Sequence, residues 1–292
     1  MRSKTLKFIG TSIVVVGGAC QEPSPAQAPK SCDFAATPSF EEFERCTTRE
    51  TATGAYIVDG DLALYSKEEL LRFYETIVSA HDDKQATENL PTAGTGGELI
   101  VHMEMGEDAV WNQTLRCDIS YCVSRDFGGR YAEVVTAMEK ATAAWAEVAG
   151  VEFRHVLTED DRCDDRNTKV MFDVRPISGQ QYLARAFFPS NRRSQRNIRI
   201  DRSSFTVEEP LTLTGILRHE VGHALGFRHE HTRPEAGRRC FENLSWRPLT
   251  PYDSESVMHY PQCGGTAGWL LELSENDGIG AAKIYGAPGD CS

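Results

Sequence analysis

The stretch His-Glu-Val-Gly-His-Ala-Leu-Gly-Phe-Arg-His-Glu-His, residues 219–231, contains four of the eight histidines in this 292-residue chain. On a helix, residues four apart share one face, so His219 and His223 can direct their imidazoles at a single ion. Gly226 has no Cβ and can therefore adopt a positive φ, ending the helix and turning the chain so that His229 becomes a third ligand. Three protein ligands leave one position of a tetrahedral zinc ion open, as a catalytic site requires. The stretch predicts a catalytic zinc site.

Glu220 directly follows the first predicted ligand, where its carboxylate can reach a water on the metal without ligating the metal itself. The alternative is a zinc site that only braces the fold, but such a site normally has four protein ligands, often including cysteine. No cysteine lies within residues 219–231. The pattern therefore favours hydrolysis by a metal-activated water, with Glu220 as the general base that later returns the proton to the leaving amine.

The helix that carries the first two ligands is predicted to begin around Glu208, Glu209 and Pro210, because acids and proline are favoured at helix N-termini. Its apolar residues would pack against the rest of the domain; they are Leu211, Ile216, Leu217, Val221, Ala224 and Leu225.

The chain after residue 98 has the pattern of an α+β domain. A long helix is expected over residues 128–150, and Ser274 is expected to cap a last helix that reaches Tyr285. Strands are expected over residues 99–105, 151–156, 169–174, 184–188 and 198–201. We predict a mixed sheet with a cleft beside an edge strand at 184–188, where an extended peptide could add as a further strand.

The motif extends in a way that resembles the astacin-like group of the metzincin zinc metallopeptidases. Astacins read G-F-x-H-E-x-x-R, and residues 226–233 read Gly-Phe-Arg-His-Glu-His-Thr-Arg; residues 256–260, Ser-Val-Met-His-Tyr, match the S-x-M-H-Y Met-turn. The resemblance implies a metzincin fold, in which a mixed sheet combines with a long N-terminal-side helix, a zinc-site helix, a Met-turn and a C-terminal helix. It also implies a zinc endopeptidase in which Met258 forms the floor under one catalytic Zn²⁺ and Tyr260 is a switchable ligand that stabilises the oxyanion.

The chain departs from the astacin pattern after Arg233, where residues 234–237 read Pro-Glu-Ala-Gly in place of an acidic run. The region 183–201 looks more like the edge strand of matrixins, and the mixture is similar to bacterial metzincins that include the HEIGH metallopeptidases. In astacins the residue equivalent to Glu230 contacts the mature N-terminus. In this chain Glu230 could instead orient a ligand imidazole.

Residues 32–97 are predicted to form an N-terminal segment, a possible prosegment, ahead of a catalytic domain at 98–292. Within it we expect a strand at residues 56–58, a turn, and a helix capped by Ser66. The sequence Val-Asp-Gly-Asp ending at Asp61 resembles the F-x-G-D of astacin prosegments, whose aspartate caps the zinc. Asp61 is thus a candidate latency ligand, although an Asp-Gly-Asp turn also occurs for purely conformational reasons.

The N-terminus has the pattern of an export signal. Basic residues precede an apolar run at 8–16 that is too short to span a membrane, which predicts a signal peptide over residues 1–19. Small residues before Cys20 predict a bacterial cell-envelope lipoprotein with its lipid on that cysteine; plain secretion is the alternative. Residues 20–31, rich in proline, alanine and glutamine, are predicted to be a disordered tether.

Cysteine count and charge limit the partners. Nine cysteines less Cys20 leave eight for disulfides in an oxidising compartment, and we expect Cys117–Cys122 and Cys240–Cys263 as local pairs. A net charge of −12 argues against nucleic acid or an anionic membrane surface as a partner. We expect a monomer that acts on a protein or peptide and touches membrane only through the lipid anchor. Two alternatives are a surface-anchored binding protein on a degenerate metzincin scaffold and a zinc hydrolase of cell-wall peptides.

Overall fold

The computed structural model of this protein describes residues 39–82, 99–236, 240 and 245–291. The predicted signal peptide, the lipid anchor at Cys20 and the tether lie outside the described residues. Among the helices that are described, none has the length and apolar character needed to cross a membrane.

A five-stranded mixed sheet lies at the centre of the part after residue 99. Its strand order is β7 (Phe153–His155), β6 (Ile119–Val123), β8 (Phe172–Ile177), β10 (Asn197–Asp201) and β9 (Ala184–Arg185). Neighbouring strands are parallel except for β9, which pairs antiparallel with β10 and forms one edge. Side chains alternate in β10, where Ile198 and Ile200 enter the main core and Arg199 lies on the opposite face.

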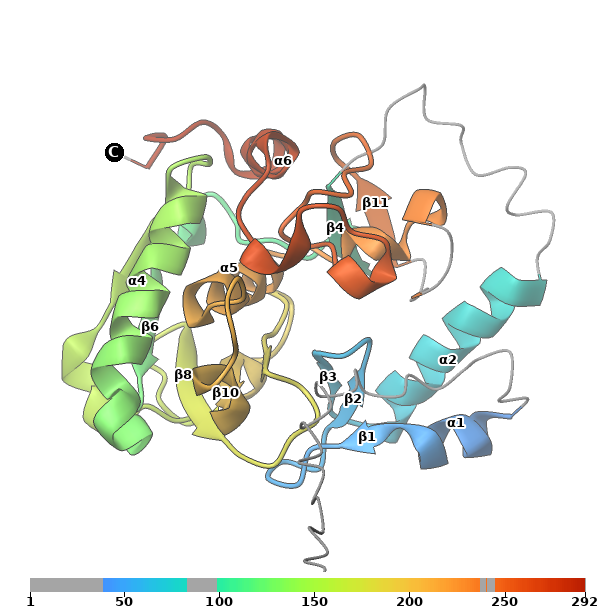
Figure 1. The fold of residues 1–292 in the computed structure, drawn as a ribbon, viewed down its shortest axis with the longest axis horizontal. Coiled ribbons are helices and arrows are strands. Elements are labelled where there is room, and N and C mark those ends of the chain that lie inside the picture. Colours follow the sequence, from blue (N-terminus) through green and yellow to red (C-terminus); the bar gives the residue numbers. More distant parts are fainter. Residues whose placement is uncertain (1–38, 83–98, 237–239, 241–244, 292) are drawn as a thin grey trace, which may run out of the picture.

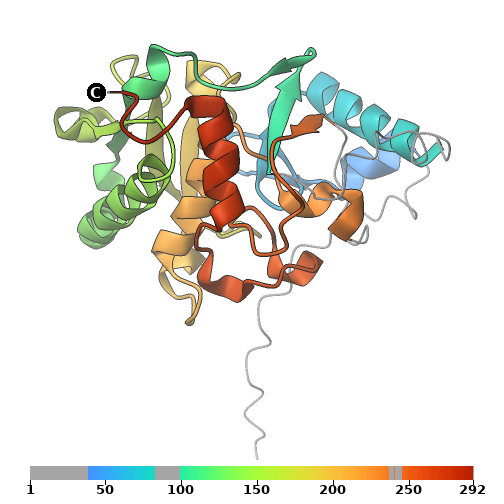
Figure 2. The ribbon, with the colours of Figure 1, turned by 90° about the horizontal axis from the view of Figure 1, so that it is seen from above.

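Two helices pack against the core face of this sheet and against each other: α4 (Tyr131–Ala146) and α5 (Leu213–Ala224) (Figure 1). A smaller sheet of β11 (Trp246–Pro248), β4 (Ile100–Glu104) and β5 (Glu107–Asp108) lies beside them. The last helix, α6 (Glu275–Tyr285), is the red helix of Figure 2. Ser274, the expected cap, forms a capping box with Asp277, and Gly286 is the C-cap. Helices and sheets are mixed, so the predicted α+β class is confirmed.

The N-terminal segment has its own small fold. It comprises α1 (Phe40–Cys46), β1 (Thr48–Arg49), β2 (Tyr56–Val58), β3 (Leu62–Leu64) and α2 (Lys67–Asp82), and its strands form an antiparallel sheet. A cluster around Phe43, Leu70 and Ile77 holds the helices to the strands. A second cluster joins Ile57 to Tyr182, so the segment packs on the edge of the large sheet (Figure 1).

Several element predictions were wrong in detail. Helix α5 begins at Leu213 with Thr212 as its cap, and the Glu209–Pro210 bond that precedes it is cis, so the predicted start was too early. The strand at 184–188 is shorter than predicted, since pairing ends at Arg185. Strand β6 was missed because all five of its residues are buried, and such a strand lacks the alternation that marks a half-exposed one.

The disulfide predictions divide. Cys240–Cys263 is present as predicted. Cys117–Cys122 was wrong: Cys122 is fully buried in the inner strand β6 and pairs with Cys163, whereas Cys117 precedes that strand and pairs with Cys291 near the C-terminus.

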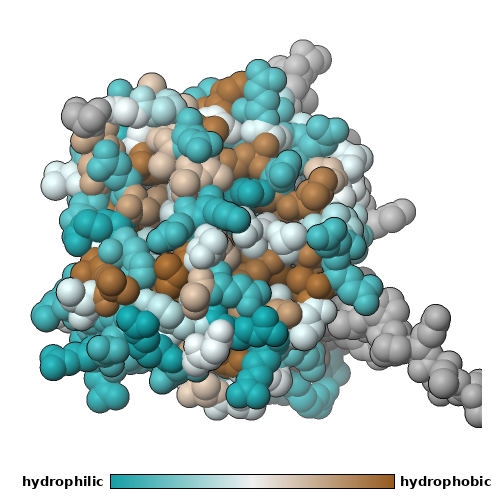
Figure 3. Space-filling view, turned by 60° about the vertical axis from the view of Figure 1, so that its left-hand side comes forward, coloured by the Kyte–Doolittle hydropathy of each residue, from teal (hydrophilic) through white to brown (hydrophobic). Residues whose placement is uncertain are grey.

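One face of the surface is shown in Figure 3. Small apolar patches there are separated by hydrophilic side chains, so this face offers no broad apolar surface.

Candidate metal centre

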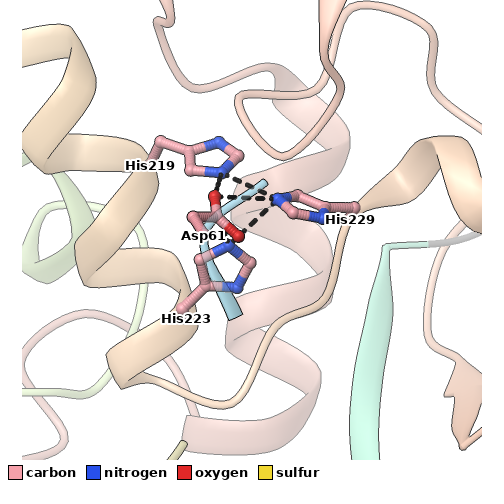
Figure 4. A group of neighbouring side chains, drawn as sticks. All are labelled: Asp61, His219, His223 and His229. Atoms are coloured by element: carbon pink, nitrogen blue, oxygen red, sulfur yellow. Dashed lines mark hydrogen bonds and ion pairs between the residues drawn. The ribbon is translucent and has the colours of Figure 1, made fainter. Parts of the chain in front are cut away.

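Three imidazoles and one carboxylate converge in a buried cluster (Figure 4). The Nε2 atom of His229 lies 3.1 Å from that of His219 and 3.2 Å from that of His223. Asp61 comes from the turn between β2 and β3, and its Oδ2 atom lies 3.2–3.5 Å from all three nitrogens. The structure therefore brings the three predicted ligands together and adds the residue that was predicted as a latency ligand.

Hydrogen bonds to the backbone fix how two of these imidazoles are protonated. His219 Nδ1 lies 2.7 Å from the carbonyl oxygen of Val257, and His223 Nδ1 lies 2.8 Å from that of Phe227. Because a carbonyl only accepts, each Nδ1 carries the proton and each Nε2 presents a lone pair to the centre of the cluster. Burial also lowers the pKa of His223 to about 4, which favours the neutral, ligating form.

These donor atoms fit a zinc ion. Two nitrogens at the usual zinc distance of about 2.0–2.1 Å in tetrahedral geometry lie roughly 3.3 Å apart, close to the separations seen in this cluster. Lone pairs at such a separation repel each other, and a cation between them would remove that repulsion. The chemistry of the set, three imidazoles with a carboxylate, is also that of zinc.

The chain reversal after α5 depends on Gly226. Its φ is +98°, and a Cβ placed there would lie 2.4 Å from the carbonyl oxygen of Ala109. The return strand is then tied to β4, since Arg228 N–H donates to the carbonyl of Ile100 at 3.0 Å. The predicted positive φ is confirmed, and its consequence is that His229 faces the helix that carries the other two imidazoles.

The turn that contains Met258 packs against α5 and holds the His219 ring in place. Met258 is fully buried, and its sulfur packs so closely on α5 that a Cβ at Gly222 would lie 2.4 Å from it. Asp277 of α6 accepts hydrogen bonds from the Ser256 hydroxyl at 2.6 Å and from Val257 N–H at 2.8 Å. Val257 in turn holds the His219 ring, so Asp277 positions a predicted ligand. In the sequence Asp277 stands only in the first turn of the predicted last helix, with no sign of this second role.

Tyr260 and Glu220 flank the imidazoles. The Tyr260 hydroxyl donates to Asp61 Oδ2, and its ring stacks on that of His219 at a centroid distance of 5.3 Å. Glu220 is buried, and its Oε2 atom has no hydrogen-bond partner among the described residues. Burial, with a contribution from the negative charge of Asp61, raises the pKa of Glu220 well above its ordinary value.

Glu230 lies behind the cluster rather than in it. Its carboxylate accepts a hydrogen bond from Asp253 N–H at 3.1 Å and lies 3.4 Å from Arg233 Nη1. Glu230 N–H donates to the Met258 carbonyl at 2.9 Å, which joins the third-ligand loop to the methionine turn. Orientation of an imidazole by the Glu230 carboxylate is not among the contacts of the described residues.

The N-terminal segment docks at two further points that the sequence did not indicate. Asp59 Oδ2 lies 3.5 Å from Arg228 Nη2, both side chains being buried. Glu50 forms a buried ion pair with Arg185 of β9. Single acids and arginines far apart in the chain carry no motif, so only the structure could reveal these pairs.

A small cavity lies between the segment and the cluster. It is lined by Asp61, Leu62, Ala186, Phe187, Phe188, His223, Arg228 and His229. The residues after β9 thus border the candidate centre, as the prediction of a cleft beside this edge requires.

Comparisons with known proteins agree with this geometry. Residues 110–239 match the family model described as Matrixin. The zinc metalloproteinase nas-30 of Caenorhabditis elegans is 38% identical over 73 residues, 19% of this chain and 10% of that protein. High choriolytic enzyme 2 of Oryzias latipes is 36% identical over 64 residues, 16% of this chain and 22% of that protein.

A solved structure is also similar: high choriolytic enzyme 1, a hatching enzyme zinc-protease from Oryzias latipes. It is 18% identical, with a TM-score of 0.39, and the match covers 61% of this chain and 95% of that one. The matched segments span about a tenth to a fifth of the length of the two curated relatives named above. The chain is thus similar to the matrixin family over residues 110–239 and to astacin-type zinc proteases over shorter segments.

Proposed function

We propose that this protein is a zinc-dependent endopeptidase. The observation that carries the proposal is the convergence of three imidazoles, two of them with their proton fixed on Nδ1. Beside them lies a buried carboxyl oxygen of Glu220 that has no hydrogen-bond partner in the part of the chain that the structure describes. His219, His223 and His229 would hold the zinc. When bound, the ion supplies positive charge that acidifies water and polarises a scissile carbonyl.

Glu220 is proposed as the general base. Glu220 directly follows the ligand His219 and is buried beside the cluster, so its carboxylate can take a proton from the attacking water and deliver it to the leaving amine. The Tyr260 hydroxyl would donate a hydrogen bond to the oxyanion. In this structure that hydroxyl donates to the carboxylate oxygen of Asp61 at the cluster, which supports this role.

We further propose that the described state is latent and that Asp61 is the cause. Its Oδ2 lies where the three imidazoles and the Tyr260 hydroxyl meet, so it would take the place of the water or the substrate carbonyl there. Asp61 is buried among the three imidazoles, and a positive charge at the centre of the cluster, such as that of a bound zinc ion, would favour its ionised carboxylate. An ionised carboxylate is the form that ligates zinc.

Export is proposed on two grounds. Three disulfides lie within the described residues, which indicates an oxidising compartment. The signal peptide and the lipid on Cys20 remain predictions of the sequence.

The substrate would be a protein or peptide, and matched assays on casein and on cell-wall peptides would distinguish the two substrate types.

The test is zinc content and cleavage of casein by the full chain, cut at a site-specific protease sequence placed within residues 83–98. We expect about one zinc per chain for the parent and for Glu220→Gln, and chelator-sensitive cleavage by the parent alone. Zinc binding without cleavage of any peptide would instead favour a binding protein on this scaffold.

A further inference from the structure

The contact between Glu50 and Arg185 lies apart from the metal ligands. The Arg185 Nε and Nη2 atoms donate to the two Glu50 oxygens at 2.7 and 2.9 Å, which is a bidentate pair. The Tyr182 hydroxyl donates to the same carboxylate, and Arg185 Nη1 donates to the side-chain oxygen of Asn197 at 3.0 Å. Both ionic side chains are fully buried. Arg185 therefore sits in a built pocket that one carboxylate fills.

This arginine is the outermost of a row. In the sheet register Arg185 is opposite Arg199, and Arg199 is opposite Arg175, so the three side chains lie side by side on the face away from the helices. Arg175 has its own acid, Asp173, at 2.6 Å. The Nε atom of Arg199 is buried and has no hydrogen-bond partner among the described residues. Glu50 is thus the carboxylate at the edge end of a row of like charges.

Removal of Glu50 would leave Arg185 without the carboxylate that neutralises its charge. Burial opposes ionisation of Glu50, yet hydrogen bonds and charge from Arg185 lower its pKa to about 2. If the N-terminal segment left, two neighbouring guanidinium groups would face each other without that acid. A guanidinium group binds a carboxylate in a bidentate way, so this exposed pair of arginines would be a favourable site for a replacement carboxylate.

The pocket is placed where a substrate would pass. Arg185 directly precedes residues 186–188, which border the cavity beside His223 and His229. Strand β9 is the outer strand in the order of the large sheet. A peptide that paired with this edge would project alternate side chains onto the face of Arg185, as the next members of its row. One side chain of the substrate would then take the position that Glu50 holds.

We propose that Arg185, with Arg199 beside it and Tyr182 donating, forms a subsite for an acidic side chain of the substrate, and that Glu50 fills this subsite in cis while the N-terminal segment is docked. The proposal rests on the proposed endopeptidase function and specifies its substrate class: peptides with glutamate or aspartate close to the scissile bond. Asp61 and Glu50 would then block two different parts of one binding cleft.

The experiment uses the full chain, folded intact and then cut at the protease sequence within residues 83–98. Its substrates are quenched peptides of one neutral sequence, with glutamate placed at each position in turn and a glutamine peptide matched to each. We expect kcat/KM to favour glutamate over glutamine by roughly tenfold or more at one position. In Arg185→Gln this ratio should fall to about one while the neutral peptide is still cleaved, and Arg185→Lys should retain part of it.

A double variant guards against misfolding, since Arg185→Gln alone leaves Glu50 buried without its partner. Glu50→Gln with Arg185→Gln removes both charges and should fold, cleave neutral peptides and show no acidic preference. Gel filtration of the cut protein gives a readout without turnover: the segment should be released more readily from Glu50→Gln than from the parent.

Two results would overturn the subsite: equal cleavage of all glutamate and glutamine peptides by the parent, or a preference that survives in the double variant. If the zinc-loaded parent cleaves neither the neutral nor the acidic peptides, the endopeptidase function itself fails, and the subsite fails with it.

Discussion

The metal centre and the Glu50–Arg185 pocket are both buried clusters of ionisable groups, but they are encoded differently. The three imidazoles lie within ten residues of one another, whereas Glu50 and Arg185 are 135 residues apart. A helix and one glycine turn bring the imidazoles together, so local rules suffice. The pocket requires a docked segment and the register of three strands. The metal centre can therefore be predicted from the sequence, whereas the Glu50–Arg185 pocket cannot, because it depends on contacts between distant segments.

The largest expected effect tests whether the locally encoded cluster performs chemistry. Glu220→Gln keeps the shape of the side chain but removes the base, so kcat should fall by about 10²–10⁴ while zinc content is unchanged. Stopped assays on casein with parallel metal analysis measure both. If activity were retained, Glu220 would not be the base, and the proposed catalytic role of the locally encoded metal centre would be wrong.

The next effect tests how the distant segment acts on that cluster. Asp61→Asn in the uncut chain keeps size and hydrogen bonding but weakens the carboxylate's hold on the centre. Cleavage by the intact chain should then rise, by roughly tenfold or more, towards that of the cut protein. Asp59→Asn is the matched control, because it weakens docking at Arg228 without touching the imidazoles. Equal activation by both would show that Asp61 only anchors the segment.

The sequence could predict the elements that repeat a local pattern. The ligand helix, the turn at Gly226 and the capping box at Ser274 follow from short-range spacing and backbone preference, and each is present. The inner strand β6 could not be predicted in this way, because all five of its residues are buried and it therefore lacks the alternation of a half-exposed strand. Pairing of Cys122 with Cys163 likewise depends on which strands become neighbours.

The same limit applies within the candidate site. Its histidines, its glutamate and Tyr260 carry a motif, and even Asp61 stands in a recognisable turn. Asp277 looks like an ordinary helix cap in the sequence, and only its contacts with Ser256 and Val257 show that it also supports the His219 ring. When a residue has both a local and a long-range role, the sequence indicates only the local role.

A smaller effect is expected at Gly226, the turn that brings His229 towards the other two imidazoles. Gly226→Ala adds a Cβ both at positive φ and in contact with the Ala109 carbonyl, so it should destabilise the fold by about 2–4 kcal/mol. Gly54→Ala is a matched control: φ there is +74°, but nothing lies within 4 Å of the added carbon, and we expect about 1 kcal/mol. Urea unfolding gives both values. Similar losses would mean that backbone conformation alone, rather than close packing, makes glycine necessary at the turn.

The smallest effect concerns the long-range half and depends on pH. Because the pKa of Glu50 is about 2 when docked and near 4.5 otherwise, its ionised form stabilises docking above pH 4.5, and this contribution is lost as the pH falls towards 2. The full contribution should be about 3 kcal/mol. Other groups titrate in the same range, so the quantity to measure is the difference in segment retention between the cut parent and cut Glu50→Gln. That difference should be constant from pH 7 to 5 and shrink between pH 4.5 and 3. A difference that stays constant down to pH 3 would mean that the charge of Glu50 does not hold the segment in place. It would also mean that Arg185 and its neighbour Arg199 do not need an ionised carboxylate beside them.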